Sequence, residues 1–148
     1  MLPTIDRQRQ VQALEEHLKG MPQADLKNFH HFDFGVYTRG GVIPAETVVT
    51  GAIHLQTSTF VLAKGTMVFL TDDGPVEVTA PWSCVSPPGV KRVAYTLTDC
   101  VCLDIAETGC TTPEQAEREL VVASYDQLTT NQRKILEGSC PTSLQARA

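Results

Sequence analysis

A succession of short apolar segments separated by turn residues runs from Phe29 to Ile105, and it constrains the fold more than any other feature. The segments are rich in Val, Ile, Thr and aromatic residues, which favour extended strands. No segment of helical length interrupts them, so a parallel α/β sheet is excluded. The pattern predicts a β-sandwich or β-barrel. The predicted strands are Phe34–Arg39, Thr47–Leu55, Thr59–Ala63, Thr66–Thr71, Val76–Ala80, Ser83–Ser86, Lys91–Thr96 and Val101–Ile105.

Turn residues separate these strands. Asp73-Gly74 is the strongest signal, because a tight hairpin needs positive φ and glycine supplies it without strain. The other predicted turns are Gly40-Gly41, Pro44-Ala45-Glu46, Lys64-Gly65, Pro87-Pro88-Gly89 and Thr98-Asp99.

Helices are predicted on both sides of the strand region. The first begins at Thr4 or Asp6, whose side-chain oxygens can cap free N–H groups, and ends at Gly20. Its apolar stripe is Val11, Leu14 and Leu18. After the strands, Thr112-Pro113-Glu114-Gln115 has the residues of a capped helix start, and this helix is expected to reach about Val121. Another helix is predicted over Asp126–Glu137.

These patterns divide the chain into three parts. Residues 1–27 form an N-terminal helix that packs on the barrel or on a partner, residues 28–107 form the barrel, and residues 108–148 form a helical extension. The chain has 148 residues, which is enough for one domain with its own core.

Charge and hydropathy exclude several classes of protein. The formal charge is −5, whereas general nucleic-acid binders present a basic face. No apolar run is long enough to span a bilayer, and the first ten residues are too polar for a secretory signal. We therefore expect no nucleic-acid partner, no membrane association and no secretion.

The cysteines do not form a disulfide pattern, because their number is odd and their spacing irregular. They are Cys84, Cys100, Cys102, Cys110 and Cys140. Free thiols in a reducing compartment are expected. Cys100 and Cys102 lie two apart in a predicted strand and share a face, so they are either half of a metal site or two small apolar residues; we favour the second interpretation.

Several stretches of the barrel region resemble a known family. They are His30-His-Phe-Asp-Phe-Gly-Val-Tyr-Thr-Arg39, Ile43-Pro-Ala, Thr50-Gly-Ala-Ile-His54, Leu62-Ala-Lys-Gly65 and Ala80-Pro-Trp-Ser-Cys-Val-Ser-Pro-Pro-Gly-Val-Lys-Arg92-Val. Together they resemble the small cupin-like proteins of tailed bacteriophages, over residues 28–107. The resemblance implies a mainly β fold, a cupin-type jelly-roll barrel with an N-terminal helix and C-terminal helices, and a phage or prophage origin.

The resemblance also implies where a metal would bind. A metal-binding cupin places two histidines at i and i+2 on one strand, a carboxylate on the next strand, and a third histidine in a later motif. Here His54 keeps the first position, but Gln56 and Arg92 hold the second and third. The carboxylate position falls on Ser58, Phe60 or Val61, none of which is acidic. The sequence therefore predicts no metal and no other cofactor.

The substituted positions define a candidate pocket. If the strand register is as expected, His54, Gln56 and Arg92 point into one cavity, and Tyr95 is a further candidate. A buried guanidinium needs an anion or carbonyl partner, which suggests a pocket for a carboxylate, phosphate or sugar. The other interpretation, which we favour, is an arginine at the barrel mouth that reaches solvent or a carboxylate such as Asp104 or Glu77. A one-residue slip would turn the candidate residues outward.

The leading hypothesis is a non-enzymatic phage structural or accessory protein, such as a capsid cement or decoration protein, with no catalytic residue. It would form a dimer or trimer, contact other phage structural proteins, and reside in the virion or in the host cytoplasm during assembly. Two alternatives remain open. One is a metal-independent enzyme of the sugar isomerase or epimerase kind, with His54 as base and Tyr95 or Arg92 as partner. The other is a module that binds a small anion through Arg92.

Overall fold

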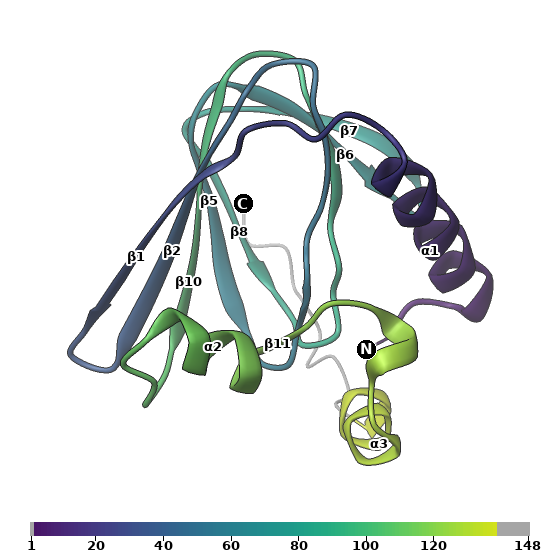
Figure 1. Ribbon diagram of the computed structural model, residues 1–148, viewed down its shortest axis with the longest axis vertical. Coiled ribbons are helices and arrows are strands. Elements are labelled where there is room, and N and C mark those ends of the chain that lie inside the picture. Colours follow the sequence, from purple (N-terminus) through teal and green to yellow (C-terminus); the bar gives the residue numbers. More distant parts are fainter. Residues whose placement is uncertain (1, 139–148) are drawn as a thin grey trace.

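Two antiparallel sheets face each other and form a barrel in the computed structural model, which describes residues 2–138 (Figure 1). The large sheet has the strand order β1 (Lys27–Asp33), β2 (Val36–Ile43), β10 (Cys100–Glu107), β5 (Ser58–Lys64), β8 (Trp82–Ser86). The small sheet has the order β3 (Val48–Thr50), β9 (Val93–Thr96), β6 (Thr66–Thr71), β7 (Gly74–Thr79). A separate short pair joins β4 (Ile53–His54) to β11 (Val121–Val122).

The helices begin where the sequence predicts caps. In α1 (Ile5–Lys19) the Thr4 hydroxyl accepts a hydrogen bond from the backbone N–H of Arg7. In α2 (Pro113–Glu119) Thr112 accepts one from Gln115. The last predicted helix is shorter than expected, because Tyr125–Gln127 forms a separate 3₁₀ turn before α3 (Thr130–Gly138). Within residues 2–138, no helix has the length and apolar character to cross a membrane.

The first hairpin differs from the sequence prediction. The strand β1 was not predicted, and the predicted turn at Gly40-Gly41 lies in the middle of β2, so that prediction is wrong. The real turn is at Phe34-Gly35, where both residues have positive φ. Glycine is needed at position 40 for another reason: a Cβ there would come within 1.8 Å of the Phe29 ring on the paired strand. The glycine allows close contact of an aromatic ring rather than a reversal of the chain.

Other strands follow the predicted pattern with local changes. The hairpin of β6 and β7 turns at Asp72-Asp73, and Gly74 has a φ of 110°, as the Asp73-Gly74 signal predicts. The single strand predicted over Thr47–Leu55 is split into β3 and β4. At the split, the Gly51 N–H donates to the carbonyl of Arg92, so the chain bends across to the strand that follows Arg92.

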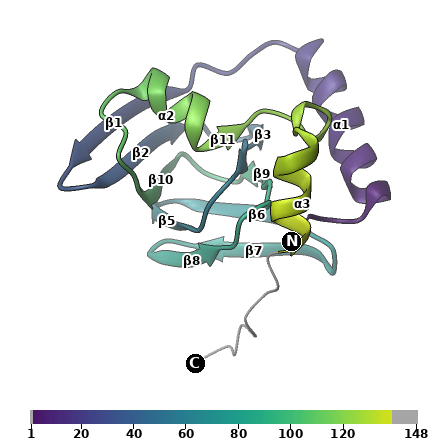
Figure 2. The ribbon, with the colours of Figure 1, turned by 90° about the horizontal axis from the view of Figure 1, so that it is seen from below.

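Buried apolar side chains form separate clusters inside the barrel and between the helices. The barrel cluster contains Phe60, Leu62, Met67, Phe69, Val78, Ala94, Cys100 and Cys102. Cys100 and Cys102 are buried in it, and burial raises the pKa of the Cys102 thiol to about 12, so this thiol is neutral. The second cluster joins Val11 of α1, Ile53 of β4 and Leu136 of α3. Figure 2 shows these two helices on one side of the barrel.

A buried lysine connects the two ends of the chain. Lys91 forms an ion pair with Glu15 of α1 and donates a hydrogen bond to the carbonyl of Ala123, which precedes the 3₁₀ turn. Only 1% of its side chain is exposed. Because Lys91 precedes Arg92 and β9, the contact ties both helical regions to the small sheet.

Candidate functional site

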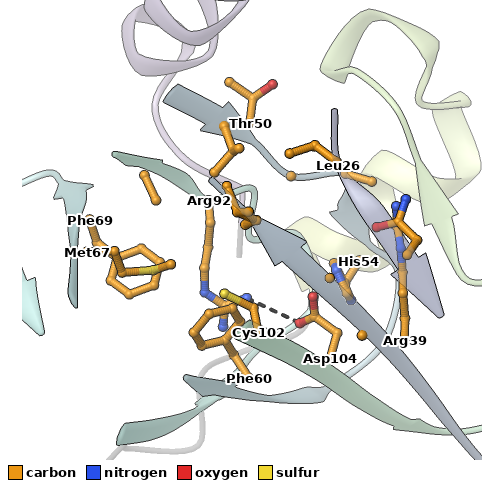
Figure 3. Close-up of a pocket in the computed structure, with 18 of the residues that line it drawn as sticks. Leu26, Arg39, Thr50, His54, Phe60, Met67, Phe69, Arg92, Cys102 and Asp104 are labelled. Carbon is orange, nitrogen blue, oxygen red and sulfur yellow. Dashed lines mark ion pairs between the residues drawn. The ribbon is translucent and has the colours of Figure 1, made fainter. Parts of the chain in front are cut away.

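A cavity of about 160 Å³ lies between the two sheets (Figure 3). Its apolar wall is made by Phe60, Met67 and Phe69, which belong to the barrel cluster. Phe60 and Phe69 meet edge to face, with ring centroids 5.5 Å apart. Near Leu26 and Gly51 the lining residues are exposed, so the cavity opens to solvent there.

Charged side chains line the same cavity because of strand register. Asp104 on β10 pairs with Arg39 on β2 and with Phe60 on β5, so the three side chains lie side by side on one face of the large sheet. Alternation along each strand places this face toward the cavity. His54 reaches the same region from β4. Figure 3 shows Asp104, His54 and Arg39 in neighbouring positions.

Arg92 is held by contacts on several sides. Its guanidinium carbon lies 4.6 Å from the centroid of the Phe60 ring, and Nη2 lies 3.5 Å from the sulfur of Cys84. Nη1 forms an ion pair with Oδ1 of Asp104 at 3.6 Å. The side chains of Arg92 and Asp104 are 18% and 30% exposed, so the pair is mostly shielded from solvent. The Asp104 Oδ1 atom is itself buried and accepts no hydrogen bond from any described residue.

Arg39 differs from Arg92 in having no fixed partner. It lines the cavity, but it makes no hydrogen bond or ion pair with any residue in the described range. Its side chain is half-buried. A half-buried guanidinium without a protein partner retains its hydrogen-bonding groups for water or a ligand.

His54 is held in its neutral form by its surroundings. Burial lowers its pKa below the ordinary value of 6.5. The Asp104 carboxylate acts in the opposite direction, and the guanidinium groups of Arg92 and Arg39 lower the pKa of His54 further. With a neutral imidazole, the charges on the cavity wall are two guanidinium groups against one carboxylate, so the cavity is positive although the chain carries −5.

The structure brings together only some of the residues that the sequence singled out. His54 and Arg92 line the cavity, and the ion pair of Arg92 with Asp104 confirms one partner predicted for it. Gln56 lines a smaller neighbouring cavity of about 30 Å³, and its amide donates a hydrogen bond to the backbone carbonyl of Glu107. Tyr95 lies on the other face of β9 from Ala94, which lines the cavity, and Tyr95 is 37% exposed.

Sequence reasoning missed Arg39 as a site residue. The error follows from the first hairpin: with a turn placed at Gly40-Gly41, Arg39 falls at the end of a strand instead of inside one. The alternation of Tyr37, Arg39 and Gly41 with Thr38 and Gly40 would have placed Arg39 on the inner face.

The donor set does not fit a divalent metal ion. Among the described residues, no group of three or more His, Cys, Asp or Glu side chains could hold one. The positions implied by the cupin resemblance hold His54, Gln56 and Arg92, and the guanidinium of Arg92 would repel a cation next to His54. We therefore derive no chemistry through a metal.

Comparison with solved structures identifies the fold. A cupin superfamily protein from Desulfitobacterium hafniense matches with a TM-score of 0.50 and 10% sequence identity, over 60% of this chain and 82% of that one. The fold is of the cupin type. The mainly β architecture predicted from the sequence is therefore confirmed. No family model matches the sequence, and no curated protein matches it.

Other solved structures match with lower TM-scores. A cupin domain from Bordetella pertussis has a TM-score of 0.46 and 21% identity, over 61% of this chain and 100% of that one. An acetylacetone dioxygenase from Acinetobacter johnsonii has a TM-score of 0.48 and 14% identity, over 57% of this chain and 61% of that one. Similarity at this level says nothing about activity.

Proposed function

We propose that this protein is a non-enzymatic, metal-free cupin-type barrel that binds a small organic anion in the cavity between its sheets. The observation that carries the proposal is Arg39, a half-buried guanidinium that faces the cavity without a hydrogen bond or ion pair to any described residue. A carboxylate is the expected partner, because guanidinium and carboxylate groups match in geometry and form paired charge-assisted hydrogen bonds.

The charges around the cavity support an anionic ligand. Arg92 forms an ion pair with Asp104, and the pKa of His54 is lowered, whereas Arg39 has no ion-pair partner among the described residues. A ligand carboxylate would neutralise it in a partly shielded site, where charge pairs are stronger than in bulk water. The buried Oδ1 of Asp104 would accept a hydrogen bond from a hydroxyl or amino group of the same ligand.

The size of the cavity limits the ligand. A cavity of about 150 Å³ in another protein holds one benzene molecule, and this cavity has about 160 Å³. A ligand of roughly ten non-hydrogen atoms or fewer would fill it. The aromatic wall of Phe60 and Phe69 favours an apolar body opposite the carboxylate. Small hydroxy acids and aromatic acids meet these requirements.

Thermal unfolding with a panel of small carboxylic acids, sugars and sugar phosphates tests the proposal. A ligand present at about one hundred times its dissociation constant adds about 2.7 kcal/mol to stability, which raises the midpoint by roughly 5–10 °C for a domain of this size. We expect this shift for one or more acids and not for neutral sugars. Arg39→Met should abolish it, because the variant keeps the side-chain stem and removes the charge.

The matched control is Arg9→Met on the exposed face of α1, which changes the net charge equally and should leave binding unchanged. Stabilisation by an acid that survives Arg39→Met would overturn the assignment of the site. Consumption of the bound compound, lost in His54→Gln, would favour the enzymatic alternative in which His54 acts as a base.

A role as a phage structural protein is a separate proposal, and it rests on the resemblance of residues 28–107 to small phage cupins. The comparisons with known proteins give it no support. Mass spectrometry of purified virions tests it: the chain should be present in a constant copy number per particle. Its absence from virions would remove the proposal without affecting anion binding.

A further inference from the structure

The outer face of the large sheet has an unusual distribution of charge. Its side chains alternate with those that line the cavity, and strand register arranges them in rows across the sheet. The two middle rows are Phe29, Gly40, Leu103, Val61 and Ser83, and then His31, Thr38, Ile105, Thr59 and Val85. Neither row contains Asp, Glu, Lys or Arg.

Charges of opposite sign lie at the two ends of this face. The row at one end is Lys27, Val42, Val101 and Lys64, and it includes Lys64 because an irregularity in the pairing of β10 with β5 skips Ala63. The row at the other end is Asp33, Val36 and Glu107. All four charged residues are exposed. The outer face, meaning these end rows and the two middle rows, is therefore basic at one end, acidic at the other and uncharged between.

The described helices lie elsewhere. α2 packs on Tyr37 and Phe32, which face the inside of the barrel, while α1 and α3 pack around Ile53 and Val93. Figure 1 shows the large sheet on the side opposite α1. Apolar side chains on the outer face remain in contact with solvent: Val85 is 56% exposed and Phe29 is 37% exposed.

We infer that two copies of this chain associate through their outer faces, with the basic end of each copy against the acidic end of the other. A two-fold axis that lies in the contact plane and runs perpendicular to the strands produces this arrangement. Lys64 of each copy then lies over the acidic end row near Glu107 of the other, and the Phe29 row packs on the His31 row. A two-fold axis parallel to the strands would instead place lysine over lysine.

Charge favours a second copy as the occupant. The chain carries −5, so two copies repel each other overall unless they meet through surfaces whose charges are complementary. The outer face has no carboxylate in its middle rows, and its two ends complement each other. Two stacked sheets keep their strands within about 30° of each other and about 10 Å apart, so long side chains at the ends can meet across the contact.

The area of the face indicates a weak dimer. Five strands about 4.8 Å apart and seven residues rising about 3.3 Å each give roughly 500 Å² in projection. Such a patch is at the upper end of what monomers expose, and it is below the roughly 800 Å² per partner of a standard interface. We therefore expect a dissociation constant in the micromolar range.

Sedimentation equilibrium of the full chain at low ionic strength is the test. The wild-type chain should show a monomer–dimer equilibrium that weakens as salt is added. Lys64→Glu should raise the dissociation constant about tenfold, because it places two acidic groups against each other at both ends. Combining Lys64→Glu with Glu107→Lys should bring the dissociation constant back toward the wild-type value, because the two facing charges are exchanged and stay opposite while Lys27 and Asp33 keep their own.

Lys134→Glu on the exposed surface of α3 is the control with the same change in net charge, and it should not alter the equilibrium. A chain that stays monomeric at its highest soluble concentration would overturn the proposal, as would a trimer. A dimer that is insensitive to Lys64→Glu would also overturn it, and would instead indicate edge-to-edge pairing through β1, which is far from Lys64. None of these outcomes depends on ligand binding in the cavity.

Discussion

Residues that follow one another in the large sheet point to opposite sides, and at the level of Asp104 the charged residues lie on the inner side, beside the apolar core. Arg39 and Asp104 face inward, whereas their neighbours Gly40 and Leu103 face outward in rows without charge. A sheet that covers a core normally has apolar residues inside and polar residues outside. Charge on the inside is costly unless it is paired, and apolar area on the outside is costly unless it is covered. The comparison supports the proposals of ligand binding on the inner face and association on the outer face.

The largest expected effect compares two adjacent residues of β5. Phe60 faces the barrel interior and is 6% exposed, while Val61 faces outward. Phe60→Ala removes a buried ring that also supports Arg92, so the free energy of unfolding should fall by about 3–5 kcal/mol. Val61→Ala should cost about 1 kcal/mol or less when measured where the chain is monomeric. Equal losses in urea unfolding would contradict the assignment of the two faces.

The next comparison uses the two adjacent glycines of β2. A Cβ at Gly40 would come within 1.8 Å of the Phe29 ring, so Gly40→Ala must displace this ring and should cost about 1–2 kcal/mol. At Gly41 the nearest neighbour is Oδ1 of Asn28 at 3.5 Å, an ordinary contact. Gly41→Ala should therefore be neutral or slightly stabilising. Thermal unfolding of both variants gives the answer, and a neutral Gly40→Ala would show that the ring does not need the glycine.

The pH dependence of stability tests the inner face alone. The pKa of His54 is lowered in the folded chain, so between that pKa and 6.5 the folded chain binds fewer protons than the unfolded chain. The free energy of unfolding therefore falls as the pH falls through this window, and it is unaffected by His54 above it. His54→Gln should have a shallower dependence on pH between about 6.5 and 5. Identical slopes for the two proteins would show that His54 is not shielded.

The smallest expected effect is on the titration of His54 by NMR. The Asp104 carboxylate raises the pKa of His54, and the Arg39 guanidinium lowers it. Asp104→Asn should therefore lower this pKa further, and Arg39→Met should raise it. Shifts in the same direction for both variants would mean that these side chains do not both face the imidazole.

Local sequence signals predicted much of the fold. Strand composition, the Asp73-Gly74 turn and the caps at Thr4 and Thr112 depend on interactions within a few residues, and the structure contains them. The first hairpin depends on contacts between strands. Gly40 is required by a ring eleven residues earlier in the chain, and no local rule distinguishes this requirement from a turn. Because the turn was placed at Gly40-Gly41 instead of Phe34-Gly35, β1 was missing from the prediction.

The candidate site was less predictable than the fold. His54 and Arg92 were found because the resemblance gives their positions, and both line the cavity. Arg39 joins them through pairing of β2 with β10, which brings together residues more than sixty positions apart. Tyr95 was a further candidate, but alternation along β9 turns it to the other face. Whether any of these residues binds a ligand stays a prediction.

The buried Lys91 makes the ends of the chain interdependent. Removing the first twenty residues would take away both Glu15, the ion-pair partner of Lys91, and Val11 of the second cluster, so the fold would lose a buried charge pair and part of a core together. The segment around Ala123 would then remain as the only described partner of Lys91. Since Lys91 immediately precedes Arg92, removing the N-terminal helix should also disturb the position of Arg92 in the cavity wall. The protein is thus poorly suited to N-terminal truncation, and tags are better attached ahead of an intact α1.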